Sequence, residues 1–258
     1  MKKSLFVTLA FLALGLLPML AGAATRNPLI ESFTNDTWPY CPSADAVFEN
    51  VIATYPTQAG GICYHVDWPD TSDPLHNIAA AVRTTYYSIT GVPAGGVDGS
   101  MSSYSGWLSA FVARLGVSAP ITITLSGQYS PILHNAYITA HVHCESTMTG
   151  TGHYIYVAIT EDNLTSMGRT YNRVERGMNL NGWGEAFSIS PGEDKDYNCT
   201  INYSTTWNTS NLKILCWVQA GQTSTKEVQN TKWESWSILS PATGVTPSTL
   251  GNIKANFH

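Results

Sequence analysis

The sequence predicts two folded parts in one chain, an α/β part followed by an all-β part. Between residues 27 and 115, short apolar runs alternate with segments whose apolar residues recur at helical spacing. From residue 121 onward, short alternating strands with turn residues at regular spacing are typical of an antiparallel β-sandwich. We therefore expect one domain over residues 24–116 and a second over residues 117–239.

The first 23 residues have the features of a secretory signal peptide. Lys2 and Lys3 give a positively charged start, residues 5–20 are apolar, and Ala21-Gly22-Ala23 has the small residues of a cleavage site. No later segment is long and apolar enough to cross a bilayer as a helix. We expect a mature protein that begins near Ala24 and works outside the cytoplasm.

Composition limits the classes of function. The chain of 258 residues has a net charge of −5, which is not the basic footprint of a nucleic-acid-binding protein. Its many Trp and Tyr residues suit exposed β-rich surfaces, and composition alone allows glycan binding as one hypothesis. An odd number of cysteines in an oxidising compartment leaves at least one thiol free or paired with another molecule. The cysteines are Cys41, Cys63, Cys144, Cys199 and Cys216.

The α/β part begins with a predicted strand over residues 27–33 and a helix over 43–55. Pro42 fits the first turn of that helix, where its missing N–H has no helical partner. Gly95 and Gly96 predict an irregular strand edge, because glycine weakens a strand. The other expected elements are a buried strand over 62–66, a helix over 75–87, a strand near 97–99 and a helix over 102–115.

Cys41 stands where the first strand, a polar turn and the first helix meet. A helix N-terminus has partial positive charge and free N–H groups, which favour a thiolate. A dithiol site needs Cys-x-x-Cys, but Trp38 stands three residues before Cys41 and Ala44 three residues after it. Cys41 is therefore either a reactive single thiol or a buried, inert thiol or half-cystine, and Cys63 on the next strand is a possible partner.

Several motifs occur in a recognisable order: Glu31-x-Phe33-Thr34, Tyr40-Cys41-Pro42, Tyr64-His65, Asp73-Pro74, Tyr87-x-Ile89-x-Gly91-Val92-Pro93 and Asp98-Gly99. Together they resemble secreted bacterial thioredoxin-like proteins of the outer-membrane-associated type. That resemblance implies a thioredoxin-like domain with a degenerate Cys-x-x-Cys motif, followed by an immunoglobulin-like β-sandwich. It also implies a location in the periplasm, at the outer membrane or outside the cell. We expect no cofactor.

The resemblance also implies roles for five residues. Val92-Pro93 would be a cis peptide bond facing the active site, with a trans bond in an ordinary turn as the alternative. Trp38 would occupy the attacking position and Cys41 the resolving one. Trp38 and Tyr40 could form a stacking platform or merely cap the domain core.

Two functions follow from these roles. The first is a non-catalytic peptide-binding, protein-binding or structural module, whose groove between Trp38-Tyr40 and Val92-Pro93 holds an extended peptide by backbone pairing. The second is monothiol disulfide exchange by a catalytic Cys41, with an external thiol that resolves the mixed disulfide. The sequence leaves the partner and the oligomeric state open.

In the second half, three candidate polar sites have simpler interpretations. His141 and His143 share a strand face, but no third ligand is evident, so we expect no metal site. Glu161 and Asp162 point to opposite faces, which favours salt bridges over an acid/base pair. The expected strands span 121–125, 136–144, 154–161, 174–178, 185–190, 196–203, 212–219 and 227–237, and residues 240–258 form an extended tail.

Overall fold

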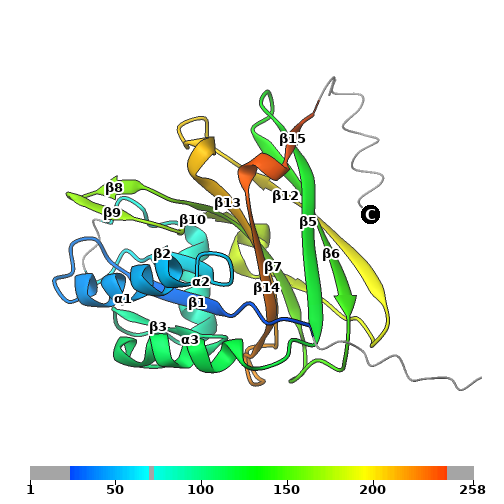
Figure 1. The fold of residues 1–258 in the computed structure, drawn as a ribbon. Helices are drawn as coiled ribbons and strands as arrows, with labels where there is room; N and C mark the ends of the chain where they lie inside the picture. Colours follow the sequence, from blue (N-terminus) through cyan, green and yellow to red (C-terminus); the bar gives the residue numbers. More distant parts are fainter. Residues whose placement is uncertain (1–23, 70–72, 243–258) are drawn as a thin grey trace, which may run out of the picture.

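The computed structural model describes residues 24–69 and 73–242 (Figure 1). The predicted signal peptide and most of the predicted tail lie outside the described residues. The first half contains β1 (Leu29–Thr34), α1 (Cys41–Thr54), β2 (Gly60–His65), α2 (Ile78–Tyr87), β3 (Ala94–Val97), β4 (Ser100–Met101) and α3 (Trp107–Leu115). The second half contains β5 (Ile121–Ser130), β6 (Asn135–Cys144), β7 (Tyr154–Glu161), β8 (Leu164–Ser166), β9 (Arg169–Tyr171), β10 (Val174–Met178), β11 (Glu185–Ala186), β12 (Asp194–Asn202), β13 (Leu212–Gln219), β14 (Val228–Ser235) and β15 (Ser240–Pro241).

The protein is a mixed α/β structure with substantial β content. One sheet has the strand order β14-β13-β7-β10-β2-β1-β3-β4, with β11 beside β7. A second sheet has the order β12-β6-β5-β15, and β8 pairs with β9 in a separate hairpin. α1 and α3 cover one face of β1 and β2, and α2 covers the other (Figure 1).

Local sequence explains where the helices begin. α1 begins at Cys41, slightly earlier than predicted, with Pro42 in its first turn. α2 begins at Ile78, three residues later than predicted, because the Asn77 side chain accepts hydrogen bonds from the N–H groups of Ala79 and Ala80 at 2.9 and 3.2 Å. Such a cap satisfies donors that have no partner within the helix.

The predicted irregular edge at Gly95 and Gly96 is wrong. β3 pairs regularly with both β1 and β4. A Cβ atom at Gly95 would lie 2.3 Å from the carbonyl oxygen of Glu31, and one at Gly96 would lie 2.0 Å from that of Ser100. The two glycines therefore permit close packing of this strand, where the sequence pattern suggested disruption.

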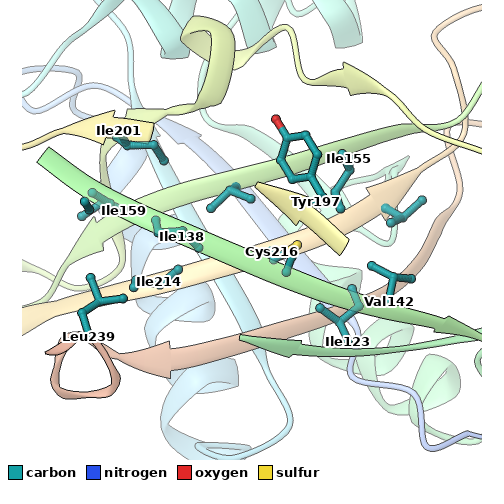
Figure 2. Packing of buried hydrophobic residues seen from close by; sticks show 14 of the residues in the cluster. Ile123, Ile138, Val142, Ile155, Ile159, Tyr197, Ile201, Ile214, Cys216 and Leu239 are labelled. Atoms are coloured by element: carbon teal, nitrogen blue, oxygen red, sulfur yellow. The ribbon is translucent and has the colours of Figure 1, made fainter. Parts of the chain in front are cut away.

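The β-sandwich core lies between the second sheet and the strands β7 and β13. Figure 2 shows branched apolar side chains from both sheets filling this space, with Cys216 and Tyr197 among them. The predicted strands over 154–161, 174–178 and 212–219 have the observed bounds. The prediction of a strand over 185–190 is wrong beyond Ala186. Ala186 pairs with Tyr154, the first residue of β7, so no residue of β7 lies opposite the residues that follow.

The two halves share one sheet, which the sequence did not indicate. β10 joins β2 in parallel, with Val174 opposite Cys63, and the Cys63 N–H donates to the carbonyl of Arg173 at 2.8 Å. Both faces of the strands β7 and β13 are also buried. Ile155 and Ile214 face the sandwich core, whereas their neighbours in the strands pack toward α2. The helical layer and the sandwich are thus packed on the same strands.

A buried ion pair connects these layers. Arg83 of α2 donates to Glu31 of β1 at 2.7 Å and to Gln219 of β13 at 2.9 Å. Both charged side chains are almost fully buried. Tyr64 and Tyr87 donate to the Glu31 carboxylate as well. The Arg83 guanidinium also lies over four aromatic rings, those of Tyr86, Tyr87, Tyr156 and Trp217.

We expect Arg83→Met to lower the free energy of unfolding by about 3–5 kcal/mol, because it leaves the Glu31 carboxylate buried without its cation. Urea unfolding monitored by tryptophan fluorescence measures this change. The matched control is Lys232→Met, which removes the half-exposed Lys232–Glu234 pair and should cost about 0–1 kcal/mol. Equal effects of the two substitutions would contradict the role given to Arg83.

Candidate functional site

The N-terminus of α1 holds the predicted catalytic cysteine in a buried position. Cys41 is the first residue of the helix, and its side chain is fully buried. The Asn35 N–H donates to the Cys41 sulfur at 3.3 Å. Burial raises the pKa of the Cys41 thiol above its usual value, outweighing hydrogen bonds that favour the thiolate. The neutral thiol is therefore the stable form at neutral pH.

Trp38 and Tyr40 have different surroundings. Their rings meet edge to face, 5.7 Å between centroids. Trp38 is half-buried and packs against the apolar cluster that contains Cys41 and Val92. Tyr40 is 67% exposed. Trp38 thus covers part of the core, and Tyr40 presents its ring to solvent.

Val92 and Pro93 complete the predicted set. The Val92–Pro93 peptide bond is cis, Val92 is buried and Pro93 is half-buried. Cys41 and Val92 belong to one extended apolar cluster, against which Trp38 packs.

A hairpin from the second half packs beside α1, which no local sequence signal indicated. Arg169 donates to the backbone oxygen of Asp36 at 2.5 Å and to the Asp45 carboxylate at 3.3 Å. Asn172, just after β9, donates to the Glu49 carboxylate through its backbone N–H at 2.9 Å and its side chain at 2.8 Å. These contacts hold β8 and β9 over a cavity of about 310 Å³ beside the first turns of the helix.

Two acidic side chains beneath this hairpin have different electrostatic surroundings. Burial raises the pKa of Asp45 to about 6, although Arg169 acts in the opposite direction. Burial alone would raise the pKa of Asp73 too. The hydrogen bond with His65 at 2.9 Å and the N–H groups of Leu75 and Asp36 outweigh it, and the pKa of Asp73 is lowered.

His65 is held by Asp73 and not by the cysteine. Its Nδ1 atom bonds the Asp73 carboxylate, and its ring lies edge-on to Tyr171 at 4.7 Å. Within the described residues, its Nε2 atom has no hydrogen-bond partner. The arrangement fits a structural role, since no hydrogen bond joins His65 to Cys41 in the described part of the chain.

No disulfide links Cys41 to another cysteine in the described chain. All five cysteines lie in the described ranges, and none of them forms a disulfide there. Cys63 is fully buried on β2, and burial raises its pKa well above the usual value. The proposed Cys41–Cys63 bridge is therefore not formed in this structure.

The other candidate polar sites form ion pairs. His141 and His143 lie on the outer face of β6 and contact Asp196 and Asp194 at 2.7 and 2.9 Å. In residues 24–69 and 73–242, no three His, Cys, Asp or Glu side chains are arranged to hold a metal ion.

Glu161 and Asp162 also form ion pairs with basic side chains and not with each other. Glu161 pairs with Arg176 at 3.1 Å, and Asp162 pairs with Lys213 at 3.2 Å. A separate finding concerns the helices: none in the described ranges is long and apolar enough to cross a membrane.

The chain is similar to solved structures in fold. HBP35 of Porphyromonas gingivalis has a TM-score of 0.68 and 14% identity, over 87% of this chain and 80% of that chain. A protein of Agrobacterium tumefaciens has a TM-score of 0.58 and 14% identity, over 86% of this chain and 98% of that chain. These identities show a shared fold alone.

A weaker likeness is to a domain of the outer membrane lipoprotein Omp28 of Porphyromonas gingivalis. It has 20% identity over 48% of this chain and 92% of that chain, with a TM-score of 0.34. No protein-family model matches this chain, and no curated protein matches it in sequence.

We expect the titration of Asp45 to make the protein less stable as pH rises. Its pKa is about 6 when folded, against an ordinary value of 3.8, so the folded state binds the proton more tightly. The stabilisation is complete below about pH 4 and is lost as pH rises through 6, amounting to about 3 kcal/mol. Asp45→Asn should remove this slope.

Urea unfolding of the wild type and Asp45→Asn at several pH values between 4 and 7 measures the effect. The difference in unfolding free energy should change with pH in favour of the variant as pH rises. Other titrating groups contribute equally to both proteins, so they cancel in the difference. A difference that stays constant across this range would rule out the assigned titration.

Proposed function

We propose that this chain is a secreted thioredoxin-like protein that acts as a non-catalytic peptide-binding, protein-binding or structural surface module. Its α/β half corresponds to a thioredoxin-like domain with an incomplete redox motif, and its second half to an immunoglobulin-like sandwich. The sheet order and the likeness in fold to HBP35 support this layout. The carrying observation is the burial of a lone Cys41 beneath a surface that still exposes Tyr40.

Peptide binding requires an accessible surface with backbone and aromatic groups. Tyr40 is exposed beside Trp38, the Val92–Pro93 bond is cis, and Val92 and Trp38 both pack in the apolar cluster that contains Cys41. An extended peptide laid there would pair through its main chain, while the Tyr40 ring would contact one of its side chains. This recognition uses no thiol, which is consistent with the loss of the dithiol motif.

We expect Tyr40→Ala to weaken binding of extended peptides by at least about tenfold, because exposed aromatic anchors carry much of the energy of such contacts. Fluorescence anisotropy with overlapping peptides from a denatured, reduced and alkylated secreted protein measures this. Trp183→Ala is the matched control, since Trp183 is also exposed, at 61%, on another surface. Absence of peptide binding, or equal affinity for the wild type and Tyr40→Ala, would refute the proposal.

The alternative is monothiol disulfide exchange through Cys41, which the position at the first residue of α1 favours. The Cys41 thiolate would attack a disulfide sulfur, forming a mixed disulfide and releasing the other sulfur as a thiolate. An external thiol would then attack the mixed disulfide and free Cys41. The burial and raised pKa of Cys41 oppose the first step.

We expect Cys41 to resist alkylation in the folded mature protein at neutral pH and to react once the protein is unfolded. Iodoacetamide labelling followed by peptide mapping measures this at each residue. The same Cys41 peptide, labelled in the urea-unfolded protein, is the internal comparison. Rapid labelling of folded Cys41, together with exchange activity that Cys41→Ser abolishes, would favour the alternative function.

A further inference from the structure

We propose that a hollow beside Trp183 binds a neutral saccharide. The hollow has a volume of about 350 Å³ and is lined by residues from the beginning of β7, the turn before β11, the turn after β13, and α2. It is a different surface from the one around Tyr40, and it does not depend on the proposed peptide binding. Its aromatic, polar and charge properties all indicate this class of ligand.

Aromatic rings form the rim and the floor of the hollow. Trp183 is 61% exposed and Tyr154 is 36% exposed, while Tyr156 and Tyr86 are buried beneath them. A large exposed aromatic side chain next to a concave surface marks a binding site more often than an isolated surface residue does. The apolar C–H face of a sugar ring can cover such a ring and remove it from water.

The backbone around the hollow is held in place. Gly184 has φ +69°, and a Cβ atom there would lie 2.6 Å from the Tyr156 ring, so the Trp183–Gly184 turn rests directly on that ring. On the opposite side, Gly221 donates to the carbonyl of Thr151 at 3.0 Å. The backbone that carries the exposed indole is therefore fixed before a ligand binds, which lowers the ordering cost of binding.

The polar groups of the hollow are neutral. Thr151, Gln222 and Thr223 supply hydroxyl and amide groups, and no Lys, Arg, Asp or Glu is among the described lining residues. Hydroxyl and amide groups can both donate and accept hydrogen bonds. They match the hydroxyl groups of a sugar and offer no counter-charge to an ionic ligand.

The charge behind the floor argues against a cationic ligand. Aromatic boxes can bind quaternary ammonium groups through the negative faces of their rings. Here the Arg83 guanidinium already lies 4.5 Å from the Tyr86 ring centre and 4.6 Å from that of Tyr156. Lys226 lies 5.7 Å from the Tyr86 ring centre. Glu31 balances the charge of Arg83, but the guanidinium already occupies the ring faces behind the hollow. Lys226 adds a positive charge beside the Tyr86 ring, so a neutral ligand is favoured over a cationic one.

The test is isothermal titration calorimetry of the mature chain with neutral oligosaccharides of glucose, mannose, xylose and N-acetylglucosamine, and with choline. We expect at least one oligosaccharide to bind and Trp183→Ala to weaken it about tenfold, as expected for the loss of one stacking aromatic ring. Trp183→Phe should retain part of the affinity. Tyr40→Ala, a matched loss of an exposed aromatic ring, should leave saccharide binding unchanged.

Near-ultraviolet circular dichroism and the urea midpoint would show that each variant is folded. The proposal is overturned if no neutral oligosaccharide binds at millimolar concentration, if Trp183→Ala binds as well as the wild type, or if choline binds more tightly than every sugar. If the wild type binds a saccharide but no peptide, only the peptide proposal is overturned. If it binds peptides but no saccharide, only the saccharide proposal is overturned.

Discussion

The buried Glu31–Arg83 pair holds the layers of this molecule in their relative positions. Two opposite charges placed in an apolar interior must stay together, because either one alone carries a large desolvation cost. Glu31 belongs to the interior strand β1, Arg83 to α2, and Gln219, which accepts a second hydrogen bond from Arg83, to β13. The helical layer and the sandwich strands are therefore positioned by one set of contacts that spans both halves of the chain.

The cost of burying a charge also explains why the Cys41 thiol stays protonated. A helix N-terminus favours a thiolate, but removal of the sulfur from water disfavours it, and at Cys41 burial is the larger effect. Trp38 stands where the resemblance places an attacking cysteine, and it packs against the cluster that encloses Cys41. The fold therefore keeps the cysteine at the helix N-terminus but removes its sulfur from solvent.

The two proposed binding surfaces depend on the interior in different ways. Tyr40 projects from the start of α1, beside a hairpin fixed by ion pairs and hydrogen bonds. The hollow at Trp183 instead rests on Tyr156 and Tyr86, whose rings both pack against the Arg83 guanidinium. The buried guanidinium thus supports the hollow's floor and occupies ring faces that a cationic ligand would otherwise use.

The sequence by itself determined the α/β elements of the first half, most strands of the second half, and the position of Cys41 at a helix N-terminus without a partner cysteine. Those features depend on local periodicity, turn residues and spacing. Only the tertiary structure decided that the halves share a sheet and that Arg169 and Tyr171 lie beside α1. It also decided that Cys41 is buried, because burial depends on tertiary packing, in which Arg169 reaches Asp45 across 124 residues of sequence.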